Sequence, residues 1–277
     1  MITVRYFLTL LIMLMLPTIA GCRFVGNDIH LVGSNTVLKP AKALAAAYAQ
    51  EHPEIKIKVD GYVSAAFHFH RNDIDMTARE MKLPEMIRAN ERGPVRDNII
   101  GYDAVAIIVH PSNPVEKLSL SQVSQILKGE IRNWNEVGGE DAKMLVVSRD
   151  CRSATLCYLK HEIMEGAVFS RRALQMKNHA DVALTVSLKK NSIGYVSAGY
   201  LDGTVKTVAL AGDGGAPAAQ PAYENIKNGS YPLVRPMHML IREDADDKVK
   251  DFMNFVYSPE GQEIIKKEGY LPVSEQK

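Results

Sequence analysis

The residues best suited to chemistry lie between Arg149 and Thr155. This segment carries one arginine and two hydroxyl side chains, Ser153 and Thr155, between an apolar run and a second stretch of apolar residues. A serine in that place is typical of a helix N-cap. The free N–H groups of a helix N-terminus, together with a forked guanidinium group, suit an oxyanion. The simpler alternative is an ordinary capped helix beside a surface arginine.

An opening β–loop–α–β pattern positions a second group of candidates. Residues 29–32 predict a strand, residues 38–49 an alanine-rich helix and residues 55–59 an alternating strand. The loop between the first strand and the helix reads Gly-Ser-Asn-Thr and ends at Thr36. Such a unit predicts a parallel sheet with right-handed crossovers.

The later segments predict a second sheet and two crossings between lobes. Residues 99–109 form a continuous apolar run, as in buried parallel strands, and a loop breaks it at residues 110–114. We expect helices at 83–91, 118–127, 154–165, 168–177, 183–188, 223–228, 246–257 and 259–267, and strands at 144–147, 193–196, 205–210 and 236–242. The predicted fold class is α/β with two lobes, each a mostly parallel sheet flanked by helices. Lobe 1 spans 22–109 and 201–277, lobe 2 spans 110–200, and the ligand lies in the cleft between them.

The first 21 residues predict an export signal rather than part of the fold. One arginine precedes an apolar segment that is short for a membrane span, and Ile-Ala-Gly then leads to Cys22. Small residues before a cysteine resemble a bacterial lipobox, which predicts lipidation at Cys22. The alternative is a plain signal peptide cut near Ala20.

Two cysteines remain if Cys22 carries lipid. Cys151 and Cys157 form an even pair in an oxidising compartment, so they predict either a disulfide or two free thiols. Without a visible histidine partner, neither cysteine is expected to be a catalytic nucleophile.

Composition and motifs exclude several classes of function. Lys+Arg number 33 and Asp+Glu number 32, and a pI near 7.7 gives no support for nucleic-acid binding. No catalytic triad, nucleophile elbow or cofactor motif is visible, so neither an enzyme nor a cofactor is expected. His68 and His70 are the one candidate metal pair, but no further ligand has suitable spacing; we expect ordinary histidines and no metal site.

Several motifs together resemble the phosphate-binding components of ABC phosphate importers. The resemblance covers nearly the whole mature chain. It includes Gly33–Thr36, the Asp73–Arg79 segment, the Trp134 block within Leu118–Gly138, the Arg149–Thr155 segment, and the Ile193–Leu201 and Asn228–Leu233 blocks. It implies a periplasmic or cell-surface lipoprotein, monomeric and with a type II binding-protein fold, that closes around inorganic phosphate and delivers it to ABC permease subunits.

The same resemblance implies a set of ligand-binding residues. They are Thr36, Val37, Ser64, Thr77, Arg149, Ser153, Ala154 and Thr155. Two departures weaken a phosphate assignment relative to a general oxyanion one. Ala154 replaces a family glycine, and Ala78 stands where well-known phosphate binders carry an aspartate that accepts the ligand's proton. The alternatives are another oxyanion or small anionic solute, or a sensory or adhesive lipoprotein of the same fold.

Overall fold

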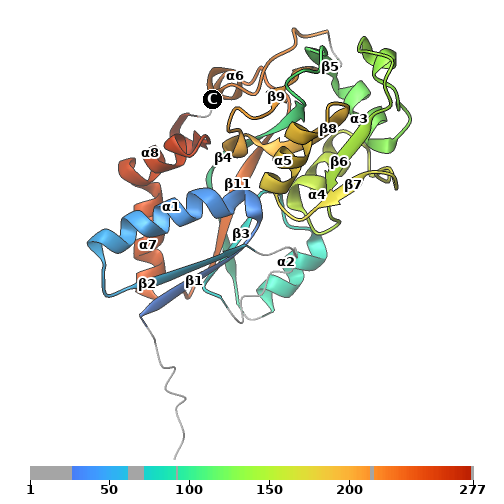
Figure 1. Cartoon of the computed structure of the whole chain (residues 1–277). Helices are drawn as coiled ribbons and strands as arrows, with labels where there is room; N and C mark the ends of the chain where they lie inside the picture. The colour runs from blue at the N-terminus through green and yellow to red at the C-terminus, as the bar shows by residue number, and fades with distance from the viewer. Residues whose placement is uncertain (1–26, 62–71, 92, 213–214, 276–277) are drawn as a thin grey trace, which may run out of the picture.

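The computed structural model of the protein describes residues 27–61, 72–91, 93–212 and 215–275 (Figure 1). The predicted signal peptide at 1–21, and with it Cys22, Ser64, His68 and His70, lie outside these ranges. In the described part, no helix combines the length and the apolar content that crossing a bilayer requires.

The chain alternates strands and helices as the sequence predicts. The strands are β1 Asp28–Gly33, β2 Lys56–Gly61, β3 Ile74–Thr77, β4 Val95–Val109, β5 Lys117–Ser119, β6 Leu145–Arg149, β7 Leu174–Met176, β8 Ser192–Ser197, β9 Lys206–Thr207, β10 Ala209–Ala211, β11 Val234–Arg242 and β12 Leu271–Pro272. The α-helices are α1 Asn35–Glu51, α2 Leu83–Asn90, α3 Leu120–Lys128, α4 Ala154–Glu162, α5 His179–Leu188, α6 Tyr223–Lys227, α7 Asp247–Tyr257 and α8 Pro259–Lys267.

One curled sheet runs through both halves of the molecule. Its strand order is β2-β1-β3-β11-β4-β8-β6-β7, with β9 and β12 also pairing with β4. The outer strands of each half pair in parallel, whereas β11 and β4 in the middle pair antiparallel with their neighbours. The predicted α/β class with two lobes is confirmed, and the antiparallel centre is what joins the two parallel halves (Figure 1).

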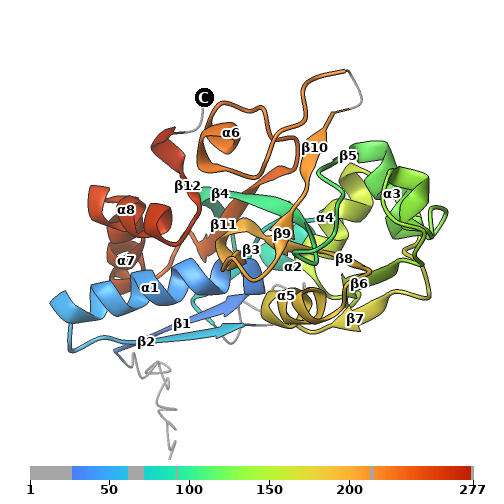
Figure 2. The same cartoon turned by 45° about the horizontal axis from the view of Figure 1, so that its top comes forward.

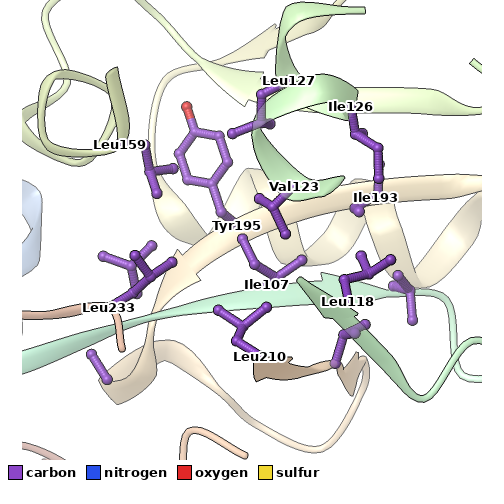
Figure 3. Packing of buried hydrophobic residues seen from close by; sticks show 14 of the residues in the cluster. Ile107, Leu118, Val123, Ile126, Leu127, Leu159, Ile193, Tyr195, Leu210 and Leu233 are labelled. Atoms are coloured by element: carbon purple, nitrogen blue, oxygen red, sulfur yellow. The ribbon is translucent and has the colours of Figure 1, made fainter. Parts of the chain in front are cut away.

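Strand β4 is long enough to belong to both lobes. Its first part pairs with β11, and from Val105 onward it pairs with β8. Period-two alternation then sends Ile107 to a core with α3 and α4, while Ala106 and Ile108 face a core with α5. Figure 3 shows the first of these cores, in which Ile107 lies close to Leu210 beneath the side chains of α3.

The segment between β8 and β11 packs with the core that contains α3. Residues of β10, α6 and the segment up to Leu233 are buried in the same core as α3, not in the core of α1, α7 and α8. The backbone N–H of Val105 donates to the carbonyl of Leu233 at 2.8 Å, so the chain passes between the lobes at two adjacent points. In this position, residues 205–233 cover apolar side chains of β4 that would otherwise face water.

Local predictions were accurate where capping signals exist. Helix α3 has a capping box of Ser119 and Gln122, and α4 begins after the predicted N-cap Ser153. The helix predicted at 168–177 is wrong: residues Leu174–Met176 form β7, which pairs with β6. The strand predicted at 205–210 is divided between β9 and β10, which pair with different partners.

Gly33 allows the close approach that positions the start of α1. A Cβ added there would lie 2.0 Å from the carbonyl oxygen of Met76 on β3. The next residue, Ser34, donates its N–H to that same oxygen at 2.8 Å and is the N-cap of α1. A side chain at position 33 would therefore separate β1 from β3 and move the helix N-terminus.

Candidate functional site

Three helix N-termini converge where the two lobes meet. Thr36 is the second residue of α1, Thr155 the second of α4 and His179 the first of α5. The Thr36 Oγ1 atom lies 3.4 Å from Thr155 Oγ1 and 3.2 Å from His179 Nε2. Figure 2 shows α1 and α5 meeting across the middle of the molecule. Helix N-termini carry free N–H groups and the positive ends of helix dipoles, so this junction favours an anion.

Arg149 lies at the carboxyl end of β6, beside this junction. Its side chain is 2% exposed, and its Nη2 donates to the carbonyl oxygen of Lys177 at 2.8 Å. The Tyr195 hydroxyl fixes the position of the backbone at Arg149, because it accepts a hydrogen bond from the Arg149 N–H at 3.0 Å. Among the described residues, Arg149 Nε has no hydrogen-bond partner. Burial lowers the pKa of Arg149, but a guanidinium group stays protonated in proteins.

Arg235 is a second buried guanidinium that we did not predict. It lies on β11 and is 1% exposed. Its Nη2 shares two hydrogens among three acceptors, which include Thr36 Oγ1 at 3.0 Å and Thr155 Oγ1 at 2.9 Å. Two further bonds, of 3.0 and 2.8 Å, join its Nε and Nη2 to Asp103 Oδ2. Its Nη1 has no partner among the described residues.

The two guanidinium groups of this junction differ in their partners. Asp103, fully buried on β4, is the carboxylate that faces Arg235, and its other oxygen accepts from the Ser197 hydroxyl at 2.7 Å. Burial raises the pKa of Asp103, while Arg235 and the Ser197 hydroxyl act in the opposite direction. Among the described residues no buried carboxylate pairs with Arg149, and the nearby Asp150 pairs with Arg152 in the loop. The described residues of the junction thus include two buried guanidinium groups and one carboxylate.

Direct hydrogen bonds hold the lobes together around these side chains. The Tyr200 hydroxyl donates to the carbonyl of Asn35 at 2.7 Å, and Lys39 Nζ donates to the carbonyl of Gly199 at 2.7 Å. The side chain of Asn35 also donates to Lys177 O at 3.4 Å, the same oxygen that Arg149 uses. The N-terminus of α1 is therefore tied to the second lobe in a closed arrangement.

The structure brings together five of the eight predicted ligand-binding residues: Thr36, Arg149, Ser153, Ala154 and Thr155. Ser153 caps α4 by accepting from the Leu156 N–H at 3.3 Å, and Ala154 is the first residue of that helix, where N–H groups have no intrahelical partner.

The remaining predictions fare differently. Val37 is buried and its N–H donates to the carbonyl of Ser34 at 3.0 Å, so that N–H is already used within the first turn of α1. The Thr77 hydroxyl donates to Arg79 O at 3.2 Å, and no described hydrogen bond joins Thr77 to the junction. Ser64 lies outside the described residues.

Cys151 and Cys157 are both free thiols in the structure. Cys151 is exposed in the loop before the Ser153 cap, whereas Cys157 is half-buried within α4. Of the two predicted alternatives, the structure has the free thiols and not the disulfide. The physical reason is that Cys151 lies outside the helix that carries Cys157, and the loop holds it out in solvent.

One signal in the sequence could have revealed Asp103 and Arg235. Asp103 interrupts an otherwise apolar run, and Arg235 is the second residue of the buried strand β11. A charged side chain in a buried strand requires a partner, so the two strands predict an ion pair. By contrast, His179 carries no such signal, because a helix start tolerates histidine. In the described part of the chain, no cluster of three or more His, Cys, Asp or Glu could hold a metal ion.

Comparison with known proteins gives a consistent set of relatives. Residues 23–260 match the model of the PBP superfamily domain. The phosphate-binding protein PstS of Pseudomonas aeruginosa is 29% identical over 281 residues, which cover 93% of this chain and 87% of that protein. An ABC-type phosphate transport receptor from Vibrio cholerae superposes with a TM-score of 0.71 at 30% identity, covering 88% of this chain and 99% of that one. A substrate-binding protein assigned to phosphate ABC transport in Clostridium perfringens, solved with bound phosphate, gives a TM-score of 0.80 at 29% identity over 89% and 99% of the two chains.

Proposed function

The chain belongs to the PBP superfamily, among the phosphate-binding proteins of ABC transporters, and we propose that it captures inorganic phosphate at the junction of its two lobes for delivery to an ABC importer. Like its relatives, it is a substrate-binding protein and not an enzyme. The observation that carries the proposal is a pair of buried guanidinium groups. Arg149 Nε and Arg235 Nη1 each lack a hydrogen-bond acceptor among the described residues.

The energetic argument rests on those two nitrogen atoms. A buried N–H group without an acceptor costs about 1–3 kcal/mol, and more when the group is charged. A phosphate oxyanion supplies several acceptor oxygens and negative charge, so it would satisfy both guanidinium groups and offset their positive charge at once. The three helix N-termini favour the same ligand.

Phosphate affinity is the experiment that tests this function. Titration calorimetry should give tight binding of phosphate to the protein without residues 1–22. Arg149→Ala should lose about 100-fold or more in affinity, since removing a buried charged donor costs roughly 3 kcal/mol. Arg152→Ala is the matched control: it lies in the same loop, but its side chain is 56% exposed and pairs with Asp150, so its affinity should stay within about twofold. Equal losses in both variants, or no heat with phosphate, would contradict the proposal.

Ligand selectivity separates phosphate from the remaining alternatives. Sulfate and arsenate are tested in the same titration. This chain has Ala78 in place of an aspartate whose carboxylate would repel a fully ionised anion such as sulfate. A preference for sulfate over phosphate at neutral pH would assign the protein to another oxyanion. Turnover of a phosphoester would contradict a transport role.

We also propose that binding closes the lobes about their two adjacent crossings, at Val105 and Leu233. The bond between the backbones of these residues would persist, while the bonds from α1 to Lys177 and Gly199 would form on closure. Small-angle X-ray scattering should show a smaller radius of gyration with phosphate. An unchanged radius would contradict the hinge.

An extracytoplasmic location follows from the family, and lipid anchoring is our further proposal. It rests on the lipobox-like residues that end at Cys22. Labelled palmitate should be incorporated into the wild-type protein and not into Cys22→Ala, which should be released from membranes. We further propose that the mature protein is a monomer, which light scattering after gel filtration would test.

A further inference from the structure

His179 is a buried histidine that touches both lobes. It begins α5 in the second lobe, is fully buried, and its ring lies 4.9 Å from the ring of Tyr200. Its Nε2 atom lies 3.2 Å from Thr36 Oγ1, which belongs to the first lobe. Nothing in the proposed function so far uses this side chain.

The hydrogen bonds of His179 determine which ring nitrogen carries the proton. The backbone N–H of Ser197 donates to His179 Nδ1 at 3.3 Å, and a backbone N–H can only donate. Nδ1 is therefore unprotonated, the neutral ring carries its hydrogen on Nε2, and Nε2 donates to Thr36 Oγ1. Burial and the neighbouring guanidinium groups of Arg149 and Arg235 lower the pKa of His179 well below its ordinary value, which agrees with a neutral ring.

Two donors then occupy the oxygen of Thr36. Arg235 Nη2 donates to it at 3.0 Å, and His179 Nε2 donates to it at 3.2 Å. A hydroxyl oxygen has two lone pairs, so both are used, and the Thr36 hydrogen has to be donated outward. Within the described junction its acceptor is Thr155 Oγ1 at 3.4 Å, which is long for an O–H···O bond.

We propose that His179 is a positioning residue for phosphate: with Arg235, it orients the Thr36 hydroxyl as an obligatory donor to an oxygen of the bound anion. This inference rests on the proposed function. Because His179 and Thr36 belong to different lobes, the oriented hydroxyl exists only in the closed arrangement. His179 would thereby add to the affinity of the closed state without itself touching the ligand.

A double-mutant cycle tests whether His179 acts through Thr36. Phosphate affinity is measured by titration calorimetry for the wild type, Thr36→Val, His179→Phe and the double variant. Phenylalanine keeps a ring against Tyr200 and removes the donor. We expect each single variant to lose about tenfold in affinity, and the double variant to lose about tenfold rather than the hundredfold of independent effects.

The outcomes separate this inference from the proposed function. Wild-type protein that gives no heat with phosphate overturns both. Wild-type binding combined with additive losses, or with a His179→Phe affinity equal to that of the wild type, overturns the inference alone. If His179→Phe fails to fold by circular dichroism, the cycle is repeated with His179→Asn, whose shorter side chain does not extend as far as Nε2.

Discussion

Replacing Asp103 by asparagine tests the charge balance of the junction. Asp103→Asn keeps the shape of the side chain but removes the carboxylate that Arg235 contacts at 2.8 Å. Both side chains are at most 1% exposed, so the variant leaves a buried guanidinium without its counter-ion. Removing one partner of such a pair costs about 3–5 kcal/mol. At about 2–4 °C per kcal/mol for a protein of this size, the melting temperature should fall by about 6–20 °C.

Thermal unfolding by circular dichroism measures this effect, with Glu116→Gln as the control. Glu116 also pairs with a basic residue, Lys206, at 2.8 Å, but its side chain is 75% exposed. We expect the control to lose less than about 1 kcal/mol. Phosphate should raise the melting temperature of Asp103→Asn, because the bound anion offsets the positive charge of Arg235 that the variant leaves without a counter-ion. A loss for Asp103→Asn as small as that of the control would refute the buried ion pair.

Three further predictions concern backbone geometry, capping and pH. Gly33→Ala should lower the free energy of unfolding, measured in urea, by several kcal/mol, because the new Cβ would clash with Met76. Gly212→Ala is the control and should be nearly neutral, because no atom lies within 4 Å of a Cβ there. Equal losses in the two variants would refute the close approach at Gly33. Ser153→Ala should cost about 1 kcal/mol of stability by removing the cap of α4, and an unchanged melting temperature would contradict that role. Lys227 and Lys266 lower the pKa of Glu275 to about 2, so its stabilising effect is complete above pH 4.5 and is lost as the pH falls through 2. The difference in melting temperature between the wild type and Glu275→Gln should therefore shrink steadily from pH 5 to pH 2. A difference that stays constant over that range would contradict this role.

Local signals in the sequence were enough to predict the strands, caps and helices that position Arg149, Thr155 and Thr36. The Arg149–Thr155 segment follows a strand and precedes a capped helix, and both features are visible within a dozen residues. The same holds for Thr36, which follows a strand and the N-cap Ser34. Because the α/β pattern places such loops at the carboxyl ends of strands, their convergence was also predictable.

The residues that complete the junction come from long-range contacts that no local pattern encodes. Arg235 and Asp103 are 132 positions apart, and His179 meets Thr36 across 143 positions. The failure at 168–177 has a similar cause: β7 is three residues long, and its strand conformation depends on pairing with β6 rather than on its own composition. The point where the chain passes from one core to the other has no local signal either, because Val105 lies within an uninterrupted strand.

A crystal structure of the protein with phosphate tests the central claim most directly. The proposal predicts one phosphate ion at the junction of α1, α4 and α5, with its oxygens about 3 Å from the guanidinium group of Arg149 and from the hydroxyl of Thr36. A phosphate ion bound elsewhere on the protein, or none bound in the presence of millimolar phosphate, would contradict the proposal that these buried donors form the ligand site.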